Sequence, residues 1–82
     1  MSPELETLDQ LQGRDLSPTV IQPLFKDREH FLRAMRAMLE TGDIRLVEAD
    51  GAEAPRARWS QLLSVESGAR LLLTSAGARR IG

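Results

Sequence analysis

Arginines supply most of the side chains in this chain that could bind a charged partner. There are ten of them, against a single lysine, Lys26. Arg28, Arg33 and Arg36 lie in a segment with helical periodicity, and Arg56 and Arg58 stand next to Trp59. Guanidinium groups form paired hydrogen bonds with phosphate and carboxylate oxygens. The two groups of arginines therefore predict contacts with an anionic partner.

The same residues also have an interpretation that needs no partner. Glu29 and Arg33, like Arg36 and Glu40, are opposite charges spaced i,i+4, which stabilise a helix by about 0.2–0.5 kcal/mol per pair. A mixed run of this kind is typical of an exposed helix face. Trp59 could likewise cover a thin core or contact a partner protein. Both interpretations stay open at this point.

Several classes of chemistry lack the residues that they require. The chain has no cysteine, so disulfides and thiolate metal sites are excluded, and its one histidine is His30. The carboxylates do not have the loop spacing of a calcium site. No nucleophile motif and no glycine-rich phosphate loop is present. We therefore expect no enzymatic activity, no metal and no cofactor.

The 82 residues are enough for one compact domain, expected over residues 1–82. Thirteen leucines provide material for its core. No apolar run approaches the length of a membrane span, and the acidic start of the chain does not resemble a signal peptide. A bacterial, cytoplasmic protein without membrane contact is the expectation, and the preference for arginine over lysine is typical of a GC-rich genome.

The formal net charge of −1 conceals an uneven distribution. Residues 1–53 hold six basic and eleven acidic side chains, whereas residues 54–82 hold five basic and one acidic, so the two halves carry −5 and +4. Such a division can direct one end of a molecule toward an anionic partner. It can equally reflect opposite charges that meet inside the molecule or in a dimer.

Two helices are predicted before residue 27. Ser2 and Pro3 form a cap-and-proline start for a helix over Pro3–Gln12, which Gly13 would end in the left-handed conformation. The apolar stripe of this helix would consist of Leu5, Leu8 and Leu11.

Ser17 and Pro18 repeat the same start for a second helix. Pro23 lacks an N–H and crowds the carbonyl one turn earlier, so this helix should be short and partly 3₁₀. We expect it to bury Val20, Ile21 and Leu24.

The best-specified element is a helix over Arg28–Thr41. Asp27 is a suitable N-cap, no glycine or proline interrupts the segment, and Gly42 follows as its stop signal. At 100° per residue one arc is apolar and faces the core, and it consists of Phe31, Leu32, Met35, Met38 and Leu39. The charged side chains lie on the opposite arc.

The second half of the chain predicts strands separated by turns. Ile44–Ala49 has the alternation of a strand, and Asp50-Gly51 is a hairpin-turn dipeptide. Arg56–Val65 fits either a strand that carries Trp59 or a turn of helix. After a second turn at residues 66–68, Ala69–Thr74 predicts a strand that pairs with the first. Thr74 or Ser75 would then cap a last helical turn that ends at Ile81.

Two ordered segments resemble the winged-helix transcription regulators of bacteria. They are Met38-Leu39-Glu40-Thr41-Gly42-Asp43-Ile44-Arg45-Leu46 and Leu72-Leu73-Thr74-Ser75-Ala76-Gly77. Regulators of the multidrug-resistance and phenolic-acid-response type commonly close the recognition helix on L-E-x-G-x-I and finish the wing with L-T-x-x-G. The resemblance implies that Arg28–Thr41 is the recognition helix and that Asp50–Ser67 is the wing.

The resulting expectation is an α+β winged helix-turn-helix with three helices and a two- or three-stranded β wing. Its leading function is binding of double-stranded DNA in transcription regulation, with DNA contacts from Arg28, Arg33, Arg36, Arg56 and Arg58. The alternative is a protein–protein interaction module on the same scaffold, in which Trp59 meets a partner protein or a second copy of the chain.

Overall fold

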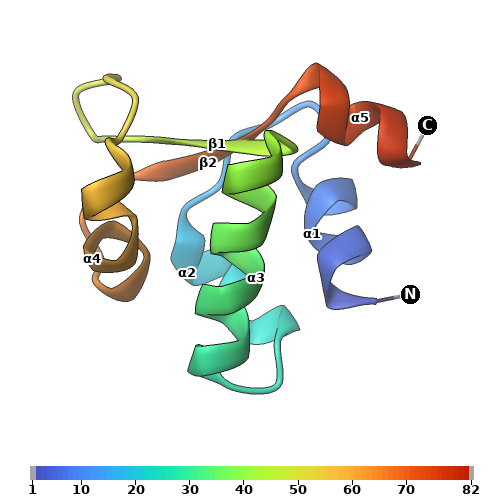
Figure 1. Ribbon diagram of the computed structural model, residues 1–82, viewed down its shortest axis with the longest axis horizontal. Helices are drawn as coiled ribbons and strands as arrows, with labels where there is room; N and C mark the ends of the chain where they lie inside the picture. The colour runs from blue at the N-terminus through green and yellow to red at the C-terminus, as the bar shows by residue number, and fades with distance from the viewer. Residues whose placement is uncertain (1, 82) are drawn as a thin grey trace.

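The computed structural model describes residues 2–81 and has the α+β composition that the sequence predicts. Helices α1, α2 and α3 lie on one side of a pair of antiparallel strands, with α4 at one end of the pair and α5 at the other (Figure 1). In chain order the elements are α1 (Pro3–Gln10), α2 (Pro18–Ile21), η1 (Gln22–Leu24), α3 (Arg28–Thr41), β1 (Ile44–Val47), η2 (Arg56–Arg58), α4 (Trp59–Ser64), β2 (Arg70–Leu73) and α5 (Ser75–Ile81). The described residues thus contain five α-helices rather than three.

The first helix begins as predicted and ends early. The Ser2 hydroxyl accepts a hydrogen bond from the Leu5 N–H at 3.2 Å. After Gln10 the chain tightens into successive i→i+3 bonds, so α1 stops two residues before the predicted end, and Gly13 adopts its left-handed conformation outside the helix. Leu8 and Leu11 are buried, whereas Leu5 remains 40% exposed.

The second helix is short and partly 3₁₀, which confirms the effect expected of Pro23. The four residues of α2 pass directly into the three of η1. Ile21 is fully buried and Leu24 is half-buried, but the predicted burial of Val20 is wrong, because its side chain is 55% exposed. Val20 stays exposed because a single helical turn can bury residues on only one narrow side.

The central helix α3 has the predicted bounds. Asp27 Oδ1 accepts a hydrogen bond from the His30 N–H at 2.7 Å, and Gly42 ends the helix in the left-handed conformation with φ of +83°. The predicted apolar arc faces the core, although Leu32 is only half-buried. The large apolar side chains least accessible to solvent come from the helices, the strands and the connection after α1: Leu8, Leu11, Ile21, Phe31, Met35, Ile44, Leu46 and Leu71.

The predicted strand pairing is confirmed. β1 and β2 run antiparallel, with Ile44 opposite Leu73 and Val47 opposite Arg70, and each strand is shorter than predicted. Leu16, in the connection between α1 and α2, adds a bridge on the other side of β2 through two backbone hydrogen bonds to Leu71, of 3.1 and 2.7 Å. The sheet therefore has two full strands, and β2 has one paired residue, Leu16, on its other side.

The segment between the strands contains two helices and no strand, which corrects the expectation of a β wing over Asp50–Ser67. Gly51 makes the predicted turn with φ of +91°, and the returning chain pairs only through a bridge between Glu53 and Val47. The sequence left open whether Arg56–Val65 forms a strand or a turn of helix. It is helical, because it contains η2 and α4. Helix α4 lies beside α3 (Figure 1), and its Leu62 and Leu63 are buried in the core.

The last helix, α5, is capped by the predicted Thr74, whose hydroxyl accepts from the Gly77 N–H at 3.1 Å. Helix α5 packs against α1. None of the helices within residues 2–81 combines the length and the apolarity that a membrane crossing requires.

Candidate functional site

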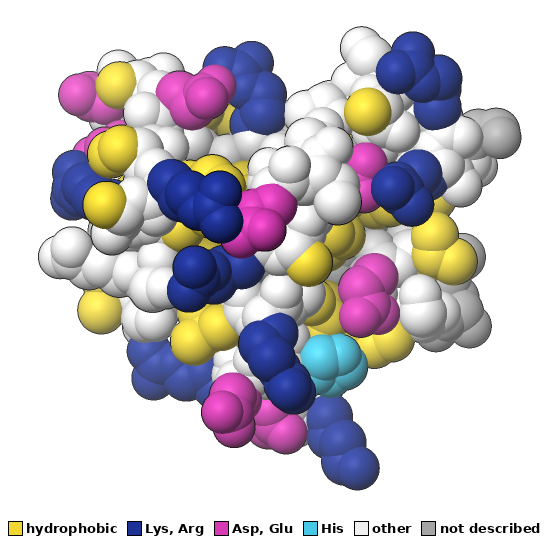
Figure 2. Space-filling model, in the orientation of Figure 1, with side chains coloured by type: hydrophobic (Ala, Val, Ile, Leu, Met, Phe, Trp, Pro, Cys, Tyr) yellow, Lys and Arg dark blue, Asp and Glu magenta, His cyan; other side chains and the backbone are white. Residues whose placement is uncertain are grey.

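The outward side of α3 is the candidate site, and we call it the α3 face. It consists of the exposed residues Glu29, Arg33, Arg36, Ala37 and Glu40. Dark blue Lys and Arg side chains follow the middle of the molecule over α3 and toward α4 (Figure 2). The face is continuous because residues spaced by three, four and seven positions share one side of an α-helix.

Arg33 and Arg36 point into solvent from the middle of this face. Neither takes part in an ion pair within residues 2–81. The predicted pairs Glu29–Arg33 and Arg36–Glu40 are therefore wrong for this conformation. The second pair is replaced by a longer-range contact, because Glu40 binds Arg56 instead.

Glu40, Arg56 and Trp59 form a compact cluster where η2 meets the C-terminal part of α3. Arg56 Nη2 donates to Glu40 Oε1 at 2.7 Å, and the guanidinium carbon lies 5.6 Å from the centre of the Trp59 ring. The Trp59 indole N–H donates to the Ala54 carbonyl at 3.3 Å, and the ring is half-buried against the core. Trp59 thus covers the core and also supports an arginine.

The other two predicted DNA-contacting arginines connect separate parts of the fold. Arg28 Nη2 donates to the Ser64 carbonyl at 2.6 Å, which ties the start of α3 to the end of α4. Arg58 Nη1 lies 2.6 Å from Glu48 Oε1, so its guanidinium is turned toward the end of the β1 segment. The structure thus places Arg33 and Arg36 on the α3 face, Arg28 and Arg56 at its α4 side, and Arg58 away from it.

The uneven charge distribution is matched inside the molecule. Four of the five basic side chains after residue 53 pair with acids of the first half, at nitrogen–oxygen distances of 2.6 to 3.4 Å: Arg56–Glu40, Arg58–Glu48, Arg70–Asp15 and Arg80–Asp43. Of the interpretations that the charge pattern left open, internal complementarity is the one seen here. The basic half alone is therefore not a free cationic surface.

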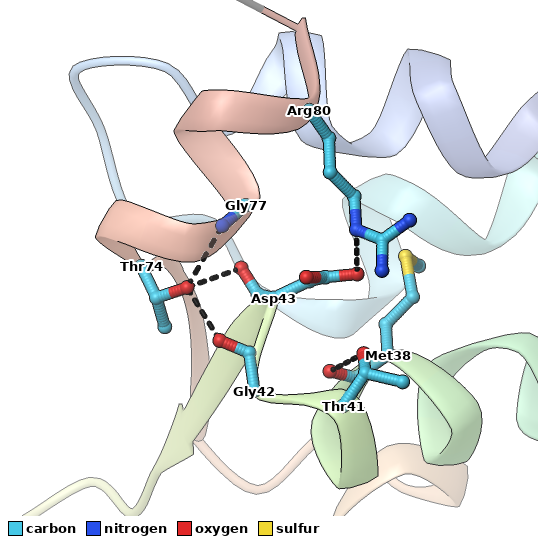
Figure 3. A network of polar contacts seen from close by, with 7 residues as sticks. All are labelled: Met38, Thr41, Gly42, Asp43, Thr74, Gly77 and Arg80. Atoms are coloured by element: carbon cyan, nitrogen blue, oxygen red, sulfur yellow. Dashed lines mark hydrogen bonds and ion pairs between the residues drawn. The ribbon is translucent and has the colours of Figure 1, made fainter.

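A polar network holds α5 against the C-terminal end of α3 (Figure 3). The Thr74 hydroxyl contacts the Gly42 and Asp43 carbonyls, and Arg80 Nε lies 2.7 Å from the buried carboxylate of Asp43. A Cβ atom on Gly77 would lie 2.1 Å from the Asp43 carbonyl oxygen. The T-x-x-G motif therefore serves packing here, since its glycine allows the close approach and its threonine caps the helix.

One groove near the α3 face has apolar walls. It lies between α1 and α3, has a volume of about 230 Å³, and is lined by the apolar residues Leu5, Leu8, Ala37 and Met38 together with Glu4, Thr41, Asp43 and Arg80. The exposure of Leu5 leaves this groove open to solvent.

Sequence reasoning missed the role of Glu40 as the partner of Arg56. The two residues are 16 positions apart, and their contact depends on how η2 and α4 pack beside α3. Local spacing favoured Arg36 as the partner, and no sequence signal marked the longer contact. No family model matches the chain, and neither a curated protein nor a solved structure matches it.

Proposed function

We propose that the chain is a winged-helix DNA-binding domain that presents α3 to the major groove. The order of elements supports this proposal: a helix, a paired residue at Leu16, the short α2–η1 unit, the long α3, and then β1 and β2, with η2 and α4 inserted between the two strands. The three residues 25–27 separate η1 from α3, which is the short turn of a helix-turn-helix. Leu16 pairs with β2 on the side away from β1, and a small winged-helix sheet would have the same order.

The observation that carries the proposal is that the α3 face holds two arginines that form no ion pair with any residue from 2 to 81. Arg33 and Arg36 are one turn apart on the exposed side of the second helix of the helix-turn-helix, and Glu40 next to them is neutralised by Arg56. Arginine is the residue most often used to read guanine in the major groove, through the O6 and N7 acceptors. Arg28 and Arg56 flank the face and are suited to phosphate contacts, whereas we assign Arg58 a smaller part because Glu48 holds it.

Fluorescence anisotropy with a labelled random-sequence duplex tests this proposal directly. Wild-type protein should bind at low salt, with an affinity that falls steeply between 20 and 200 mM NaCl because phosphate contacts release counterions. The double substitution Arg33→Ala, Arg36→Ala should weaken binding by about tenfold or more, since two charge-assisted contacts are lost.

The matched control is Arg14→Ala, which removes the same kind of charge away from α3. Arg14 hydrogen-bonds only within its own segment, to Gln10, so this variant should bind nearly as the wild type does. No binding by the wild type at tens of micromolar protein would contradict the proposal, as would equal losses in the control and the double variant.

A protein-interaction module is the second candidate, favoured by a different observation. Four arginines of the basic half are already paired within the chain, and the groove beside Leu5 leaves apolar surface open. Trp59, which is only half-buried, would add to such a contact. Light scattering separates a monomer from a dimer, and a dimer without DNA binding would support this candidate.

A further inference from the structure

The cluster of Glu40, Arg56 and Trp59 is built so that its arginine can change partners. The Arg56 and Glu40 side chains are 66% and 42% exposed. Exposed ion pairs of this kind contribute little stability, because water and salt screen them. The Trp59 ring provides a second contact of similar strength, because its centre lies 5.6 Å from the guanidinium carbon of Arg56. Arg56 can therefore leave the carboxylate and still keep its contact with Trp59.

Arg36 lies one turn before Glu40 on the same face, at the i,i+4 spacing of a helical ion pair, and forms no ion pair within residues 2–81. The positive charge of Arg36 therefore stays near the Glu40 carboxylate when Arg56 leaves it.

We propose that Arg56 is a phosphate-binding arginine that exchanges from Glu40 to the DNA backbone when α3 enters the groove. This inference rests on the proposed DNA-binding function and assigns a further role within the same site. Arg56 carries five N–H donors, of which one contacts Glu40. A phosphate oxygen can compete for these donors, because it is an anionic acceptor like the Glu40 carboxylate. Hydrogen bonds between ions are stronger than those between neutral groups. Glu40 then acts as an internal competitor that holds the arginine in place before DNA arrives.

A double-substitution cycle on Glu40 and Arg56 tests the exchange, with anisotropy titrations of the same random duplex at several salt concentrations. Glu40→Gln removes the competitor and should tighten binding about two- to fivefold, the range that one exposed ion pair covers. Adding Arg56→Ala to Glu40→Gln should weaken binding again by a similar factor. It should also make the log–log salt dependence shallower by about 0.9, the value of one phosphate contact.

Arg33→Ala is the matched control within the α3 face. Arg33 is seven residues, or two helical turns, from Glu40, so its removal should reduce affinity by the same factor with and without Glu40→Gln. Circular dichroism melting of each variant checks that these exposed substitutions leave the fold intact.

Two results would overturn the inference in distinguishable ways. If Glu40→Gln and the doubly substituted protein bind equally, with the same salt slope, Arg56 only neutralises Glu40 and does not contact phosphate. If the wild type itself fails to bind the duplex, the proposed function is wrong, and the exchange is excluded together with it. A contribution of Arg56 in the Glu40→Gln background is the result that supports the exchange.

Discussion

Gly77 is the described glycine with the least room for a side chain. It lies where α5 crosses the backbone of Asp43, and a Cβ atom there would be 2.1 Å from a carbonyl oxygen and 2.8 Å from a Leu73 methyl group. Backbone atoms cannot move aside as the end of a flexible side chain can. A larger residue at position 77 would therefore force α5 to shift away from the end of α3.

Gly77→Ala should therefore destabilise the domain although alanine is the better helix former. Overpacking of this kind typically costs about 1–3 kcal/mol, which corresponds to a melting temperature lower by several degrees in a domain of this size. Circular dichroism melting measures the change. Ser75→Ala, at an exposed position of the same helix, should change stability by less than about 0.5 kcal/mol. Equal melting temperatures for the two variants would contradict the close packing of Gly77 against the Asp43 backbone.

At the scale of elements, α3 was predictable because its signals are local. An acceptor at Asp27, an apolar arc and a glycine at position 42 define its start, its face and its end within 16 residues. Helix α4 has no comparable signal, because its N-cap Arg58 makes no side-chain capping bond and Pro55 precedes it closely. Its six residues are helical because Leu62 and Leu63 pack into the core beside α3, and this tertiary contact cannot be read from the segment alone.

The N-cap of α3 gives a prediction at this scale. Asp27→Ala removes the acceptor of the His30 N–H and should cost about 1 kcal/mol of unfolding free energy in urea titrations. Asp27→Asn should retain most of the stability, because asparagine caps helices nearly as well as aspartate does. Equal losses in the two variants would mean that the side chain acts through its charge rather than as a cap.

At the scale of the whole molecule, four arginines of residues 54–82 form ion pairs with acidic residues of the first half. The composition shows this division of charge, but it does not show the partners, since Arg70–Asp15 and Arg80–Asp43 join residues 55 and 37 positions apart. The same limit applies to the candidate site. Periodicity located Arg33 and Arg36 on an exposed helix face, whereas the positions of Arg28, Arg56 and Arg58 depend on α4.

Salt should therefore destabilise this protein, and the sign follows from its charges. A net charge of −1 leaves little overall repulsion for salt to relieve, whereas the five arginine–carboxylate pairs within residues 2–81 are attractive contacts that salt screens. Raising NaCl from 20 to 300 mM should cost about 1 kcal/mol in total and lower the melting temperature by roughly 4–8 °C. Arg58→Gln, which removes the pair with Glu48, should show a smaller decrease. A melting temperature that rises with salt would mean that unpaired like charges, and not these pairs, dominate the electrostatics of the fold.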